Sequence, residues 1–144
     1  MGFYGKAVRL QPNIMNTWNL AIADVIQRYT PENSGIVVFG LHSGLSSISP
    51  EIPYFSQRKG FTVPDWAEDR VENDPASHLG PKGLGAIVFC SRKNRERYNR
   101  IIRQYADPTK PRLFSVYGCY VWLPQTPTVV LADGTSIAPT RFIE

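Results

Sequence analysis

Residues 85–90 form an apolar run that is followed directly by a basic stretch, residues 92–105. The run has the length and composition of a buried β-strand, and apolar residues recur at helical spacing in the basic stretch. Ser91 stands between the two segments and can cap the helix with its hydroxyl group. We therefore predict a buried strand followed by a basic amphipathic helix whose apolar face comprises Tyr98, Ile101, Ile102 and Tyr105.

The rest of the chain predicts one more long helix and several strands. Apolar residues at helical spacing predict a helix that starts at Asn13 or Asn16 and runs to about Tyr29. Strands are expected at residues 6–10, 36–39 and 113–123. The last of these is apolar or aromatic on both alternating faces, which indicates a central position in a sheet.

The end of the chain has the pattern of a β-hairpin. Asp133 and Gly134 supply the chemistry of a two-residue turn between residues 128–131 and the return strand, residues 135–143. Pro139 lacks a backbone donor, so the return strand should lie at a sheet edge. The predicted fold is α+β, with a single mixed or antiparallel sheet of about five to six strands, two main helices on one face and a C-terminal β-hairpin.

A chain of 144 residues suits one globular domain, residues 1–144. Prolines interrupt residues 40–83, which we predict to be a long irregular loop with short strands at 54–55 and 61–63 and helical turns at 65–72. No apolar run reaches the ~18 residues that span a membrane. The N-terminus shows no secretory signal, so a cytoplasmic location without membrane contact is expected.

The positive charge is concentrated in one segment. The chain has a net charge of +4. Residues 92–112 contain eight basic and two acidic residues, a net of +6, so the remainder carries −2. Residues 65–74 form an acidic segment with five carboxylates and one arginine. Such local basicity favours an anionic partner.

The basic helix is therefore the candidate binding site. Guanidinium groups match phosphate oxygens, and a row of them binds a nucleic-acid backbone without reading its sequence. Nucleic acid is the leading candidate partner and an acidic protein surface is the second. The alternative is a solvated helix face that pairs with the acidic segment. The candidate residues are Arg92, Lys93, Arg95, Arg100 and Arg103.

Two other classes of function stay open. The return strand at residues 135–143 can offer a sheet edge to a partner protein or to a second copy, as in a homo-oligomer. His42 and Ser43 follow the strand at 36–39, where α/β proteins place ligand loops, so a small-molecule binder or enzyme is the third reading. No residue pattern indicates catalysis, a metal site or a cofactor.

Cys90 and Cys119 both fall in apolar strand-like runs. Two buried, reduced thiols are the expected state in a cytoplasmic protein, and a disulfide between neighbouring strands is the alternative. Tyr117, Tyr120 and Trp122 resemble a stacking platform for single-stranded nucleic acid, although a central strand would bury them in the core.

Overall fold

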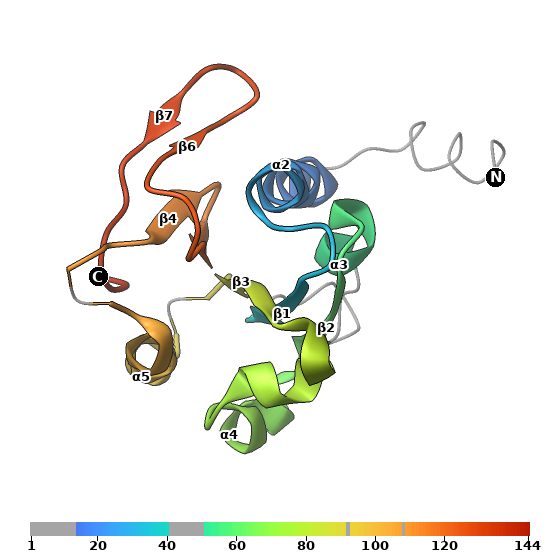
Figure 1. Cartoon of the computed structure of the whole chain (residues 1–144), viewed down its shortest axis with the longest axis vertical. Coiled ribbons are helices and arrows are strands. Elements are labelled where there is room, and N and C mark those ends of the chain that lie inside the picture. Colours follow the sequence, from blue (N-terminus) through green and yellow to red (C-terminus); the bar gives the residue numbers. More distant parts are fainter. Residues whose placement is uncertain (1–13, 41–50, 92, 108) are drawn as a thin grey trace, which may run out of the picture.

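The structure is a computed structural model that describes residues 14–40, 51–91, 93–107 and 109–144 (Figure 1). The strand expected at residues 6–10 lies outside these residues. The helices are α2 (Ile14–Tyr29), α3 (Glu51–Ser56), α4 (Glu68–Val71) and α5 (Arg95–Tyr105), with 3-10 turns η1 (Asp65–Ala67) and η2 (Pro75–Lys82). The strands are β1 (Gly35–Phe39), β2 (Lys59–Val63), β3 (Leu84–Phe89), β4 (Leu113–Val116), β5 (Cys119–Trp122), β6 (Val129–Val130) and β7 (Ser136–Ile137).

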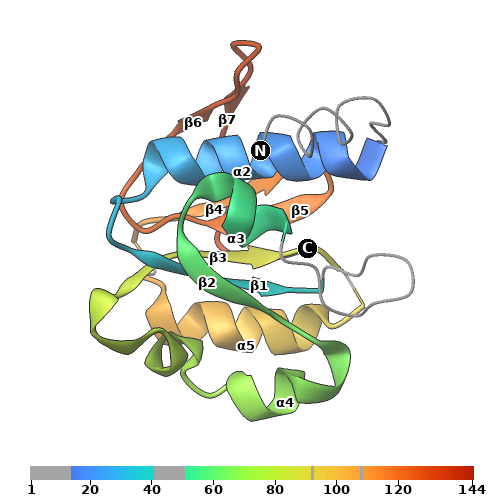
Figure 2. The ribbon, with the colours of Figure 1, turned by 90° about the vertical axis from the view of Figure 1, so that its right-hand side faces the viewer.

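Five strands form a mixed sheet in the order β2-β1-β3-β5-β4. The strands β1, β2 and β3 run parallel, whereas β5 is antiparallel to both β3 and β4. The predicted C-terminal hairpin is also present: β6 and β7 pair as a separate two-stranded sheet that projects from the domain (Figure 2). The predicted α+β class with a mixed sheet is confirmed.

The two main helices cover opposite faces of the sheet, so the prediction of both on one face is wrong. Figure 2 shows the sheet between α2 and α5. All five residues of β1 are buried, and their side chains alternate between the two faces. Ile36 and Val38 pack in the core beneath α2, whereas Val37 and Phe39 pack in the core beneath α5. A strand that is apolar on both faces needs cover on both.

The single strand predicted at residues 113–123 is two strands joined by a tight turn. Tyr117 and Gly118 both have positive φ angles, 48° and 84°, as a type I′ hairpin turn requires. Val116 then pairs with Cys119 across the turn. The apolar residues on both sides concealed the turn in the sequence, and Gly118 was its one signal. As a result β5 is an inner strand and β4 is an edge strand.

Much of the region predicted to be an irregular loop is ordered. Tyr54 and Phe55 belong to α3 and not to a strand, whereas residues 61–63 belong to β2 and the predicted helical turns at 65–72 are present as η1 and α4. Gly60 allows β2 to approach β1 closely, because a Cβ atom there would collide with the carbonyl oxygen of Ile36.

Cys90 and Cys119 form a disulfide with a Cα–Cα distance of 4.1 Å, so the prediction of reduced thiols is wrong and the alternative of a cross-strand bond is realised. The neighbouring pair Phe89 and Tyr120 sets the register that places the two cysteines opposite each other. Structural disulfides are typical of oxidising compartments. The bond therefore lends no support to the cytoplasmic location, which stays a prediction. Within the described ranges no helix is long and apolar enough to cross a membrane.

Candidate anion-binding site

The basic helix begins later than predicted. Its N-cap is Asn94, whose carbonyl oxygen accepts the backbone N–H of Tyr98 at 3.0 Å. The Ser91 hydroxyl instead accepts the backbone N–H of Lys93 at 3.1 Å, so Ser91 does not cap the helix. The predicted end at Tyr105 is confirmed. Lys93 consequently lies in the turn before the helix, and Arg92 lies outside the described residues.

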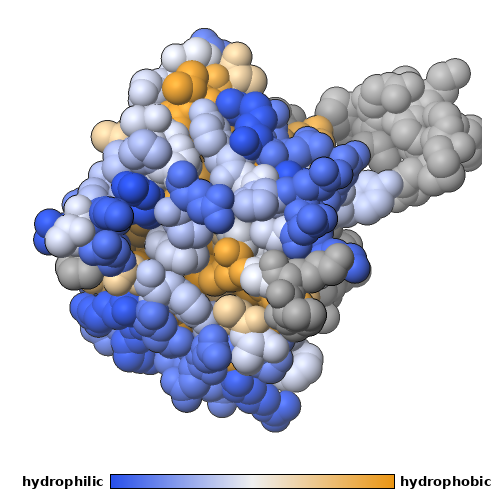
Figure 3. Space-filling view, in the orientation of Figure 1, coloured by the Kyte–Doolittle hydropathy of each residue, from blue (hydrophilic) through white to orange (hydrophobic). Residues whose placement is uncertain are grey.

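The predicted faces of α5 are confirmed. Tyr98, Ile101 and Ile102 are buried, and Tyr105 is half-buried. The ring of Tyr98 packs against those of Phe89 and Phe39, with centroid distances of 5.0 and 5.7 Å. The exposed side of the helix carries Arg95, Arg100 and Arg103, and Lys93 is exposed in the turn before it. Figure 3 shows hydrophilic side chains gathered over the part of the surface where Figure 1 places α5 and α4.

Glu68 of the acidic segment is fully buried against the first half of α5. Its Oε1 accepts a hydrogen bond from Asn94 Nδ2 at 2.9 Å, and its Oε2 accepts one from the Tyr98 hydroxyl at 2.9 Å. Arg97 Nη1 lies 3.4 Å from Oε1. These contacts anchor α4 on α5 and satisfy the carboxylate, as a buried charge requires.

Glu72 extends this pairing by one helical turn. Its Oε1 lies 3.2 Å from Arg97 Nε, in an ion pair without hydrogen-bond geometry. Its Oε2 accepts hydrogen bonds from the Nε and Nη2 groups of Arg100, at 3.3 and 3.2 Å. Two arginines on this half of the helix therefore face two carboxylates. The alternative prediction for this helix is a solvated face that pairs with the acidic segment. Arg97 and Arg100 do pair with that segment.

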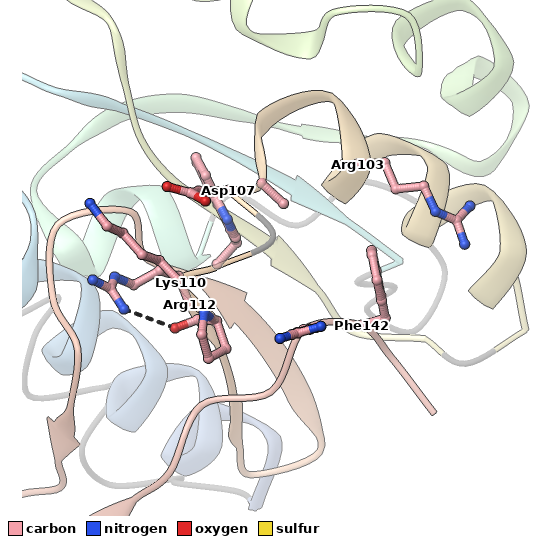
Figure 4. A pocket seen from close by; sticks show the side chains of 9 residues that line it. Arg103, Asp107, Lys110, Arg112 and Phe142 are labelled. Atoms are coloured by element: carbon pink, nitrogen blue, oxygen red, sulfur yellow. Dashed lines mark hydrogen bonds between the residues drawn. The ribbon is translucent and has the colours of Figure 1, made fainter.

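A pocket of about 230 Å³ lies beyond the last turn of α5. Its lining comes from α5, the following loop, β5 and the C-terminal segment: Arg103, Ala106, Asp107, Lys110, Pro111, Arg112, Trp122, Arg141 and Phe142. Figure 4 shows Asp107, Lys110 and Arg112 grouped on one side of the pocket and Arg103 with Phe142 on the other.

Two pairs of hydrogen bonds hold the C-terminal segment beside α5. The backbone groups of Thr140 and Leu113 bond to each other at 2.7 and 3.1 Å. The side-chain amide of Asn99 donates to the Ile143 carbonyl at 3.0 Å and accepts the Ile143 N–H at 2.8 Å. The guanidinium of Arg103 then lies over the ring of Phe142, 5.0 Å from its centroid. Part of the predicted free sheet edge is thus used within the chain.

The pocket is strongly positive. Four basic residues face one acid, Asp107, a net charge of +3. In the described part of the chain no carboxylate oxygen lies within 4.0 Å of these basic groups. Hydrogen bonds from the Thr109 hydroxyl and backbone N–H, at 2.7 and 2.9 Å, lower the pKa of Asp107, and Lys110 and Arg112 add to this effect. Asp107 therefore stays ionised at neutral pH.

Arg112 is the least accessible base of the pocket. Its Nη1 donates to the Pro111 carbonyl at 3.0 Å. Its Nε is buried and has no acceptor among the described residues. An unsatisfied buried donor is costly to the stability of the fold.

Tyr105 connects the acidic segment to the pocket. Its hydroxyl donates to Asp74 Oδ1 at 2.6 Å and accepts the Ala76 N–H at 3.1 Å. Burial and the bond to Asp74 raise its pKa to about 12. Its ring packs on Trp122 at 5.7 Å, and Trp122 is only 7% exposed, so core packing is confirmed for this residue. Tyr117 lies in the turn, so the aromatics form no platform along one strand.

The residues predicted from the sequence are only partly brought together. Arg103 borders the pocket, whereas Lys93 and Arg95 lie at the other end of α5. Asp107, Arg141 and Phe142 were missed, because only the pairing of the C-terminal segment brings them to α5. The charge count over residues 92–112 was the one signal for Lys110 and Arg112.

The other predicted sites receive no structural support. His42 and Ser43 lie outside the described residues. Among the residues that are described, no group of three or more metal-ligating side chains occurs. Comparisons with protein families, curated proteins and solved structures found no match, so the site is interpreted from its own geometry.

Proposed function

We propose that the protein binds an anionic partner, nucleic acid, and that it does so by contacting the phosphate groups of the nucleic-acid backbone. The observation that carries this proposal is the cluster of four basic residues around the pocket, none of which is paired with a carboxylate in the described part of the chain. Lys93 and Arg95 add two exposed charges at the start of α5. The proposal requires no catalytic residue, metal or cofactor.

The helix sets the length of strand that can be bound. Its 11 residues span about 16 Å, which corresponds to the rise of roughly five nucleotides along one strand of a duplex. Phosphates can therefore contact Arg95 at one end and Arg103 at the other. Arg100 lies between them, but Glu72 already occupies its guanidinium. Binding should thus become markedly tighter when the strand is long enough to reach both ends.

The test is fluorescence anisotropy of a labelled single strand and a labelled duplex across a salt series. We expect binding with a steep salt dependence for strands of several sequences. Replacing Arg95 and Arg103 with glutamine should lower the slope by about 1.4 for a single strand, since each phosphate contact contributes about 0.7. Affinity should fall evenly across sequences, because backbone contacts do not read bases.

Lys59→Gln is the control for loss of charge. Lys59 is exposed and starts β2, at the opposite edge of the sheet from β4. Its replacement should leave the slope unchanged. An unchanged slope in the folded Arg95→Gln, Arg103→Gln double variant, or no binding at low salt, would contradict the proposal and direct attention to acidic protein partners.

A further inference from the structure

The pocket beyond α5 contains apolar surface that a phosphate backbone would leave unused. Ala106, Pro111 and Phe142 contribute to its lining, together with the small exposed part of Trp122. Flat apolar surfaces beside cations suit the stacking of nucleobases. The cavity of about 230 Å³ is smaller than the ~300–1,000 Å³ of sites for drug-sized ligands. It therefore suits one ring system, with any attached phosphate at the rim.

The polar groups of the pocket also differ from those of a simple phosphate site. Asp107 would repel a phosphate, yet it stays ionised within the basic cluster. Thr109 donates twice to its Oδ1, and no described residue hydrogen-bonds to its Oδ2. A free carboxylate oxygen can accept a hydrogen bond from the amino group of a base, as in contacts to N4 of cytosine.

The buried donor of Arg112 adds no second contact to a base. Arg112 lies on the same side of the pocket as Asp107 (Figure 4), and its buried Nε lacks an acceptor among the described residues. Because that Nε is closed to a ligand, the matching contact is the free Oδ2 of Asp107, which suits a base edge that carries an amino group. Cytosine and adenine have such an edge. Uracil presents an oxygen where cytosine presents the amino group.

We infer that this pocket binds one nucleotide with an amino-bearing base, with the amino group of the base toward Asp107 and the phosphate toward Arg103 and Arg141. The inference rests on the proposed function, because it assigns the base contact of the same anion-binding surface. The nucleotide can come from a free nucleoside monophosphate or from an unpaired position in a strand.

The first arm of the test is calorimetric titration of the whole protein with cytidine 5′-monophosphate, uridine 5′-monophosphate and ribose 5-phosphate. Cytidine monophosphate should bind about tenfold more tightly than uridine monophosphate, as a good contact to a base edge allows. Ribose 5-phosphate should bind no better than uridine monophosphate. Equal binding of all three compounds, or binding of none, would overturn the inference.

Two variants locate the contacts. Asp107→Asn should remove the preference for cytidine monophosphate, because the amide can donate to O4 of uracil and retains an oxygen that holds the Thr109 turn. Arg141→Gln should weaken both nucleotides alike, because it removes a rim charge. Lys59→Gln should change neither. A preference for cytidine monophosphate that survives in Asp107→Asn would overturn the assignment of Asp107.

The second arm distinguishes a free nucleotide from an unpaired nucleotide of a strand. It also shows whether the pocket inference fails while the proposed function stands. A short labelled cytidine strand is compared with an abasic strand of the same length. Weaker binding of the abasic strand supports an unpaired nucleotide as the ligand; equal binding of both strands, with cytidine monophosphate still preferred, supports a free nucleotide. If nucleotides fail to discriminate but the abasic strand binds with a steep salt slope, the pocket inference fails and the proposed function stands.

Discussion

The two ends of α5 carry similar charges in the sequence but differ in what those charges contact. In the first half of the helix, Arg97 and Arg100 are held by Glu68 and Glu72. At the last turn, Arg103 joins three other basic residues around the pocket, and Asp107 is the one acid among the described residues that line it. The comparison teaches that a count of basic residues overstates the charge available to a partner, because packing decides which of them are already paired.

The largest expected loss of stability comes from breaking the ion pairs in the first half of α5. Glu68→Ala should lower the free energy of unfolding by about 3–5 kcal/mol, because it removes the buried acceptor of the Asn94 amide and the Tyr98 hydroxyl and breaks one of the two ion pairs of Arg97. Urea denaturation measures this loss. Glu72→Gln is the control and should cost about 1 kcal/mol or less, since Arg100 is exposed. Similar stability of Glu68→Ala and wild type would show that the carboxylate does not anchor α4.

Removing the disulfide tests how the start of α5 is joined to the strand that carries Trp122. It links the residue after β3, shortly before α5, to β5, the strand that carries Trp122. The sequence separation of 29 residues predicts a loss of about 3–4 kcal/mol when the bond is removed. The measurement compares unfolding of the wild type with and without reductant, with the Cys90→Ser, Cys119→Ser double variant as a reductant-insensitive control. Two free thiols in the unreduced protein would contradict the bond.

A substitution at Tyr105 tests the hydrogen bonds that join the acidic segment to the end of α5. Tyr105→Phe removes the hydrogen bonds to Asp74 and Ala76 and should cost about 1 kcal/mol. The folded-state pKa is raised from 10.0 to about 12, so the stabilisation is present below pH 10 and is lost as the pH rises toward 12. Urea midpoints between pH 9 and 12 should fall more steeply for wild type than for Tyr105→Phe. Parallel curves would contradict this role.

Local patterns predicted much of the fold. The apolar run at residues 85–90, the helical spacing of Tyr98, Ile101 and Ile102, and the turn at Asp133 and Gly134 each depend on neighbouring residues. The placement of α2 and α5 on opposite faces was also implicit in the fully apolar residues 36–39, because such a strand needs cover on both faces. The turn at Tyr117 and Gly118 was concealed by the apolar residues around it.

The site was less predictable, because its parts come from distant segments. The burial of Glu68 against Asn94 and Tyr98 depends on how α4 packs, and no local pattern distinguishes it from a solvated acid. Arg141 and Phe142 reach the pocket only through the pairing of Thr140 with Leu113 and of Ile143 with Asn99. Their positions follow from tertiary structure alone.

The most direct measurement compares Arg100→Gln with Arg103→Gln in single-strand binding across a salt series. The two residues are exposed arginines three positions apart on α5, and each substitution removes one positive charge. Arg103→Gln should lower the salt slope by about 0.7, whereas Arg100→Gln should leave it nearly unchanged because Glu72 already pairs with that guanidinium. Equal reductions by both variants, or a larger one by Arg100→Gln, would contradict the claim that ion pairing decides which arginines bind.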